Sequence, residues 1–303
     1  MNKIKENLIA AFLFLCALLT IAVTLGMIAV LGFESLSFFR TVSIRAFFFS
    51  NEWTPFFAER KFGILPLFSG SLLVAVIALL LALPAGFSIA VYLSEYARPK
   101  VLNRVRSLLE LLSSIPTVVF GFFALFFVSP LLARMFPGVE TMNALSPALV
   151  MGVMLIPYYT FLCDEALAEV PDRFRQASYA LGSNRLQTAF RIVVPAARPG
   201  LAFATLLSAS RAMGETMIVA IAAGQASGMA LNPLHPVETL STYMVHISSG
   251  DLPLSSFGFK TIFAVGFVLF LFTFMLNSLA YYIKKRYTDN KAGHPFFTSG
   301  GAL

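Results

Sequence analysis

Long apolar runs bounded by charged residues divide most of the chain. A helix needs about 20 mostly apolar residues to cross the roughly 30 Å hydrocarbon core of a bilayer. We predict one such helix in each of six runs, at 8–31, 67–93, 115–132, 147–163, 201–223 and 261–283. The pattern therefore predicts an all-α, polytopic membrane protein with six transmembrane helices.

The composition excludes an ordinary water-soluble protein. Hydrophobic residues make up 58% of the 303 positions and charged residues 12%, whereas a soluble domain carries roughly 25% charged residues. The chain also has 32 Phe residues and a mean hydropathy of +0.80. Lipid accepts such side chains around the whole circumference of a helix, which a soluble fold cannot do.

The net charge of +7 changes meaning once the basic residues are placed on the spans. If the N-terminus is cytoplasmic, fifteen of the 22 Lys and Arg residues lie in cytoplasmic segments, six lie outside and Arg211 lies within a span. Cytoplasmic loops of membrane proteins carry this excess. We therefore expect both termini to be cytoplasmic, membrane lipid to be a partner, and nucleic acid not to be one.

The chain lacks the usual sequence signatures of an enzyme. It contains neither G-x-x-x-x-G-K-[ST] nor G-x-G-x-x-G, so it has no recognisable phosphate-cradling loop. The His and Cys residues lack metal-ligand spacing, and no nucleophile can be placed beside a base. We expect no catalytic residue, no metal site and no cofactor in this chain, so any nucleotide hydrolysis belongs to a partner.

The connection 164–200 is polar but patterned like a pair of helices. Pro171 can open the first helix, and Gly182 can end it in a left-handed conformation. Asn184 can cap the second helix, with Gln187 three residues later as in a capping box. We expect two short helices at an angle.

The second of these helices should carry an exposed apolar stripe of Leu186, Phe190 and Val193, and should end at Pro195 and 199–200. Such a hairpin could lie on anionic lipid. It could equally dock into a groove of a cytoplasmic protein.

Residues of this connection resemble the EAA loop of ABC importer permeases. In that loop E-A-A is followed by Gly and then by I-x-L-P, and this chain has Gln176-Ala177-Ser178, Gly182 and Ile192-x-Val194-Pro195 at the same spacing. The residue types differ at Gln176, Ser178 and Val194. The resemblance implies docking into an ATP-binding subunit. The residues it assigns to this coupling are Gln176, Ala177, Gly182, Leu186, Phe190, Ile192 and Pro195.

Arg211 and Glu215 are charged residues within the fifth predicted span. An intramembrane charge is costly and normally faces a cavity or a partner. A separation of four residues places both on one face of a continuous helix, so they could neutralise each other. The pair could be a permanent salt bridge, or Arg211 could bind an oxyanion through its fork of donors.

Three segments resemble the phosphate-specific permeases of the PstC type. They are 210–217 (SRAMGETM), 114–121 (SIPTVVFG) and 238–243 (ETLSTY), within a similarity running from about 67 to 285. The resemblance implies a type I ABC importer permease fold in a bacterial plasma membrane, with Arg211, Glu215 and Thr216 on the substrate path.

The same resemblance implies the partners and the division of the chain. We expect a PstB-type ATPase dimer that binds ATP and Mg, a PstA-type sister permease and an extracytoplasmic PstS-type phosphate-binding protein. We divide the chain into 1–66 (first helix and outer loop), 67–285 (transmembrane domain with coupling loop 164–200) and 286–303 (cytoplasmic tail). Alternatives are a permease for phosphonate, sulfate or molybdate, an ion-coupled secondary anion transporter, or a membrane-embedded enzyme.

The outer loop 32–66 resembles nothing we can name, but it is rich in aromatic residues. Trp53 lies near several Phe residues, and aromatic rings are favoured at the depth of lipid headgroups. We expect an interfacial segment with rings facing lipid.

Overall fold

The computed structural model describes residues 3–292 except 58, 251 and 254–255, and the described part is almost entirely helical. Six of its helical segments are long and apolar enough to cross a membrane, as predicted. These segments are Lys5–Phe39, Leu65–Glu95, Thr117–Met135, Leu145–Ala168, Arg185–Met213 and Phe257–Arg286.

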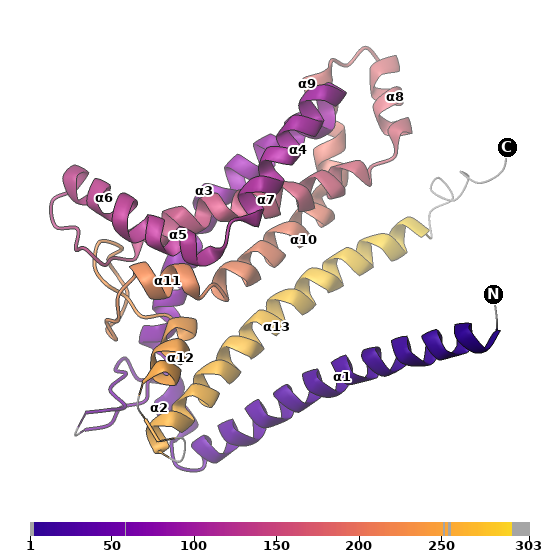
Figure 1. Ribbon diagram of the computed structural model, residues 1–303. Helices are drawn as coiled ribbons and strands as arrows, with labels where there is room; N and C mark the ends of the chain where they lie inside the picture. The colour runs from indigo at the N-terminus through magenta and orange to yellow at the C-terminus, as the bar shows by residue number, and fades with distance from the viewer. Residues whose placement is uncertain (1–2, 58, 251, 254–255, 293–303) are drawn as a thin grey trace.

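The elements follow one another along the chain as shown in Figure 1. Their bounds are α1 (Lys3–Phe39), α2 (Ile44–Phe49), α3 (Leu65–Glu95), α4 (Pro99–Ser114), α5 (Thr117–Phe123), the π-helical turn η1 (Ala124–Val128), α6 (Ser129–Met135), α7 (Leu145–Ala168), α8 (Asp172–Ala180), α9 (Arg185–Thr188), the π-helical turn η2 (Ala189–Val193), α10 (Val194–Met213), α11 (Met217–Ala222), α12 (Leu240–Ser249) and α13 (Phe257–Ala292).

Helices α3 and α7 form the centre of the molecule. Gly152 of α7 lies against α3, and a Cβ at this position would come within 3.0 Å of the Ala78 carbonyl oxygen and 2.8 Å of a Leu81 methyl carbon. Small residues allow such close packing of membrane helices. Farther along the pair, Thr160 donates a hydrogen bond to the carbonyl of Gly86. The pair is therefore a tightly packed unit to which other elements attach.

The molecule has two distinct ends (Figure 1). Helices α2 and α12 lie at one end and α8 and α9 at the other, while the start of α1 and the end of α13 both point towards the α8 end. Helix α1 runs beside α13 and diverges from the rest of the bundle. The start of α1 and the end of α13 thus lie on the same side as the connection that resembles the EAA loop.

The predicted boundaries of the fifth span were wrong. Instead of beginning at 201, the helical segment runs from Arg185 to Met213 and passes through Pro195 and Pro199. The π-helical turn η2 immediately precedes Val194 and Pro195. A π-turn widens the helix locally, and so it can accommodate a ring that would otherwise clash with the preceding turn. The prolines therefore do not end the helix.

The third span contains the same arrangement. The π-helical turn η1 ends at Val128, directly before Ser129 and Pro130, and helix α6 continues beyond them. A repeated π-turn ahead of a proline explains how two spans remain helical despite residues that break helices in water.

The expected lipid-facing character of 32–66 was only partly right. Phe49 and Phe57 are exposed, but Phe47 and Trp53 are fully buried. The Trp53 ring lies edge-on to that of Tyr243, with centroids 5.0 Å apart. Helix α12, which we did not predict, supplies Tyr243, so the aromatic residues form a core between 32–66, α12 and α13.

Candidate functional site: the broken fifth span and the docking loop

The fifth span ends in a three-residue break. Helix α10 stops at Met213, and α11 starts at Met217. Between them, the Thr216 hydroxyl donates to the carbonyl of Gly214 at 3.1 Å. Ser241, in the first turn of α12, donates to the carbonyl of Glu215 at 2.9 Å. Backbone that leaves a helix at membrane depth is tolerated where protein or a cavity surrounds it, and here two hydroxyls satisfy its carbonyls.

Glu215 caps the helix that follows the break. Its Oε1 atom accepts hydrogen bonds from the backbone N–H groups of Met217 at 3.2 Å and Ile218 at 3.4 Å. Negative charge is favourable at a helix N-terminus. The Glu215 carboxylate is therefore occupied by backbone donors of α11.

Arg211 lies in the last turn of α10, not in the middle of a continuous span. Its guanidinium carbon lies 4.5 Å from the centre of the Tyr158 ring of α7, which is cation–π geometry. The residue is exposed. Among the residues that the structure describes, no carboxylate forms an ion pair with Arg211.

The predicted neutralisation of Arg211 by Glu215 is therefore not seen. The prediction assumed a continuous helix, in which residues four apart share a face. Because Gly214 ends α10, Glu215 leaves that face and turns to α11. Sequence reasoning also missed Tyr158 and Ser241, which come from other helices and carry no local signal of this contact.

The segment 172–193, called the docking loop after its expected role, has the two predicted helices. Gly182 adopts the left-handed conformation, with φ of +81°. Asn184 and Gln187 form the capping box, with reciprocal hydrogen bonds of 2.8 and 3.0 Å. The buried hydroxyls of Ser178 and Thr188 lie 2.9 Å apart and link α8 to α9. Helix α8 begins at Asp172, one residue after Pro171.

The candidate coupling residues have different environments. Gln176, Ala177, Gly182, Leu186 and Phe190 are exposed, and Ile192 and Pro195 are half-buried. The exposed stripe predicted on the second helix is shorter than expected, since Val193 is fully buried. Its side chain belongs to the core formed by α3, α7 and α10. Only Leu186 and Phe190 of that stripe are available to a partner.

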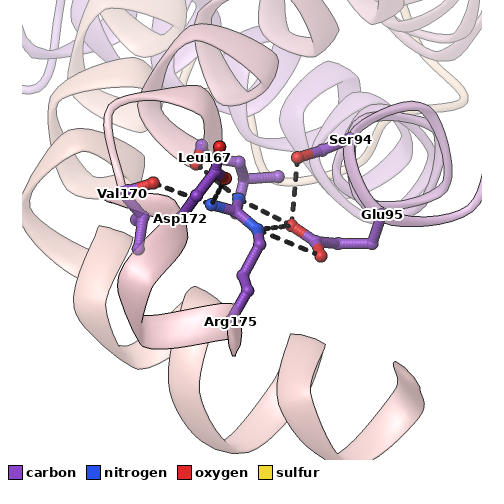
Figure 2. A network of polar contacts seen from close by, with 6 residues as sticks. All are labelled: Ser94, Glu95, Leu167, Val170, Asp172 and Arg175. Carbon is purple, nitrogen blue, oxygen red and sulfur yellow. Dashed lines mark hydrogen bonds and ion pairs between the residues drawn. The ribbon is translucent and has the colours of Figure 1, made fainter. Parts of the chain in front are cut away.

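Arg175 of α8 makes an extensive polar network that the sequence did not reveal (Figure 2). Its Nε and Nη2 atoms lie 3.1 and 2.8 Å from Oε1 of Glu95, the last residue of α3. The Arg175 and Glu95 side chains are 15% and 4% exposed. Burial acts to lower the pKa of Arg175, but the hydrogen bonds and the charge of Glu95 more than offset it, so the pKa is raised.

The family follows from comparison with known proteins. Residues 82–289 match the family described as "Binding-protein-dependent transport system inner membrane component". The chain belongs to this family. It is therefore a multi-pass membrane subunit of a transport system, and by the family's description transport depends on a binding protein.

Individual relatives of this permease cover most of its length. A probable ABC transporter permease protein, YqgH of Bacillus subtilis, is 32% identical over 89% of this chain and 88% of its own. The phosphate transport system permease protein PstC of Mesorhizobium japonicum is 30% identical over 80% of this chain and 78% of its own. PstC 1 of Mycobacterium tuberculosis is 30% identical over 72% of this chain and 71% of its own.

Solved structures of ABC importers share the fold of this permease. A chain of a bacterial alginate ABC transporter, in complex with an alginate-bound periplasmic protein, covers 93% of this chain and 96% of its own length. The TM-score is 0.63 and the identity 13%. A chain of the inward-facing MetNI methionine transporter gives a TM-score of 0.54 at 16% identity, over 73% of this chain and 94% of its own. The predicted ABC importer permease fold is confirmed.

Proposed function

We propose that this permease forms the translocation path of an ATP-driven phosphate importer. The observation that carries the proposal is the similarity to relatives named phosphate transport system permease, at about 30% identity over more than 70% of the chain. The chemistry of the broken span agrees with an anionic substrate. Arg211 offers charged donors there, and no carboxylate among the described residues is paired with it.

Arg211, Glu215 and Thr216 line the substrate path in this proposal. A guanidinium binds a tetrahedral oxyanion through two parallel hydrogen bonds, which a Lys ammonium cannot do. Glu215 has a positioning role, since its carboxylate holds the start of α11. Thr216 adds a hydroxyl beside the break. Arg211 binds the anion while the path changes from outward to inward access, and Glu215 and Thr216 hold the backbone of the break beside it.

The docking loop couples the permease to ATP hydrolysis by a partner. The exposed Leu186 and Phe190 side chains provide an apolar contact for an ATPase dimer of the PstB type, which binds ATP and Mg. The loop and both termini then lie in the cytoplasm of a bacterium. A PstA-type sister permease completes the path, and a PstS-type binding protein delivers phosphate from outside.

The substrate assignment is tested by reconstituting this permease in lipid vesicles with the ATPase, sister permease and binding protein encoded in the same genome. We expect ATP-dependent uptake of radiolabelled phosphate that excess unlabelled phosphate abolishes. With sulfate, phosphonate or molybdate at the same excess, phosphate uptake should stay within about two-fold of its value without a competing anion. If one of those anions competes better than phosphate, the substrate assignment is wrong. Uptake driven by an ion gradient without ATP would instead support a secondary transporter.

A further inference from the structure

The five N–H donors of Arg175 connect the docking loop to the centre of the bundle. Nη1 donates to the carbonyl of Val170 at 2.7 Å and to Asp172 at 3.2 Å. Nη2 donates to the carbonyl of Leu167 at 3.1 Å as well as to Glu95. With Nε also on Glu95, every donor that a guanidinium possesses has an acceptor.

Apart from Asp172 on its own helix, the acceptors of Arg175 belong to three different segments (Figure 2). Glu95 ends α3, and Leu167 lies in the last turn of α7. Val170 lies in the connection to α8. Basic side chains near a helix C-terminus bind its last carbonyls favourably. Arg175 thus fixes the start of α8 to the ends of both central helices.

The remaining contacts of the docking loop differ in kind. The hydroxyl pair of Ser178 and Thr188 links α8 only to α9. Helix α9 continues through η2 into α10. Apolar side chains of the loop, Phe174 and Val193 among them, also pack in the core that contains Ala90 and Val91 of α3. The loop is therefore joined to the membrane helices by the backbone into α10, by this apolar packing, and by the polar cluster of Arg175 with Glu95.

Burial makes the connection through Arg175 and Glu95 stiff. The Glu95 side chain is 4% exposed and also accepts a hydrogen bond from Ser94 at 3.2 Å. Removing one partner of a buried charge pair leaves the other uncompensated, so the pair is costly to separate. A movement of α8 must consequently move the ends of α3 and α7 with it.

We propose that Arg175 and Glu95 are positioning residues that transmit movement of the docking loop to α3 and α7. This inference rests on the proposed function, because it assigns the pair to coupling between an ATPase and the transport path. In this role neither residue needs to contact the substrate or the nucleotide. The pair converts displacement of α8 into displacement of the central helices, while Leu186 and Phe190 provide the docking contact.

A nearby ion pair provides the matched control. A cavity of about 580 Å³ lies where the ends of α3 and α7 meet α4 and α8. Two ion pairs line it: Arg175 with Glu95, and Arg106 with Asp164. Arg106 and Asp164 lie 2.5 Å apart and join α4 to α7, and both residues lie outside the docking loop. Asp164→Asn therefore breaks a cytoplasmic ion pair and leaves the proposed connection intact.

The test compares Glu95→Gln, Arg175→Lys, Asp164→Asn and the unchanged chain in the reconstituted complex. For Glu95→Gln we expect the amount of co-purified ATPase to stay within about two-fold of that of the unchanged chain. The ATP hydrolysed per phosphate imported should rise about ten-fold. Arg175→Lys keeps the charge but has three donors, so its ratio should be intermediate. In the exchanged pair, Glu95→Arg with Arg175→Glu, the number of ATP molecules hydrolysed per phosphate should fall part of the way back to that of the unchanged chain. Asp164→Asn should leave that number unchanged.

Two results would overturn the inference. One is an unchanged ATP-to-phosphate ratio in both Glu95→Gln and Arg175→Lys. The other is loss of ATPase co-purification in proportion to import, which would make the pair part of the docking contact itself. If Glu95→Gln does not fold, the same ATP-to-phosphate ratio is measured in Arg175→Lys and in the exchanged pair, and an unchanged ratio in Arg175→Lys overturns the inference.

Failure of the proposed function can be recognised separately. If the unchanged complex imports no phosphate, only the substrate assignment is lost. The role of Arg175 and Glu95 is then tested by measuring the distance between two spin labels, placed at the exposed positions Leu80 of α3 and Tyr281 of α13. Adding ATP and vanadate should change their separation in the otherwise unchanged chain and change it less in Glu95→Gln. An equal change in both would overturn the inference without reference to phosphate.

Discussion

At the scale of single residues, the local conformation decides what a charged side chain can do. Arg211 and Glu215 are four residues apart, yet the end of α10 at Met213 separates their environments. Glu215 binds the backbone of α11, and Arg211 stacks on Tyr158. A cation that is held over a ring rather than neutralised by a carboxylate keeps its donors for an anion.

Replacing Arg211 tests its role on the substrate path. Hydrogen bonds to charged groups contribute about 1.5–3 kcal/mol, so Arg211→Ala should lower phosphate uptake by about ten- to hundred-fold. Arg211→Lys should recover only part of it, because an ammonium lacks the bidentate fork. Initial uptake rates and ATPase co-purification are measured together. Normal uptake by Arg211→Ala would remove this residue from the path.

Replacing Gly182 tests the turn between α8 and α9. A Cβ at this position would meet nothing within 4 Å, so only the positive φ of +81° opposes a side chain. Left-handed backbone costs an L-residue about 1–2 kcal/mol. For Gly182→Ala, amide hydrogen exchange in 176–188 should therefore accelerate by about five- to thirty-fold.

Gly228 provides the control for the Gly182 experiment. It also has open space around its would-be Cβ but no positive φ, so Gly228→Ala should leave exchange in its own segment unchanged. Equal effects of the two substitutions would mean that the turn geometry is not what Gly182 provides.

At the scale of elements, the docking loop presents apolar side chains beyond the end of the bundle. Leu186 is 59% exposed and Phe190 is 48% exposed, whereas Val193 on the same helical segment is buried. An apolar contact that is completed only by another protein is typical of a helix that enters a groove. In the proposed function, the stripe thus divides into an exposed part for the ATPase and a buried part for the core of the permease.

A charge at Leu186 should disrupt this contact. Burying an unpaired carboxylate in an apolar groove is unfavourable, so Leu186→Glu should weaken ATPase binding by about ten-fold or more. Leu231→Glu is the matched control, since Leu231 is 83% exposed in the connection after α11. Pull-down titrations with the purified ATPase measure both variants. Identical affinities for the two would exclude Leu186 from the interface.

At the scale of the whole molecule, an aromatic core holds the end opposite the docking loop. Trp53 lies between the rings of Phe47, Phe62 and Tyr243, with centroids 5.0 to 6.3 Å apart. Edge-to-face aromatic pairs at these distances add to the free energy gained from burial. The cluster joins the connection before α3 to α12, and α12 in turn to the break that contains Glu215.

Removing Trp53 should loosen this end. The Trp53 side chain is 1% exposed, and truncating such a residue to Ala costs about 3–5 kcal/mol. Phe49→Ala is the control because Phe49 is 77% exposed, and its effect should stay within about 0.5 kcal/mol. Unfolding in detergent is followed by circular dichroism, since Trp53 is the only Trp available for fluorescence. Equal stabilities of the two variants would contradict a core role for Trp53.

The amino-acid sequence by itself determined the class of fold and the local geometry of the docking loop. Six apolar runs predicted the spans, since a bilayer requires a fixed length of apolar helix. Gly182 and the capping box of Asn184 were also predicted correctly. These features depend on residues that are close in the sequence, so their energetics can be read locally.

Only the tertiary structure decided which residues meet. Two π-turns keep proline-containing spans helical, and the break after Met213 directs Glu215 away from Arg211. The partners Arg175 and Glu95 are 80 residues apart, and Trp53 meets Tyr243 across a still longer separation. No local periodicity encodes such contacts, because they arise from how helices pack after each has formed.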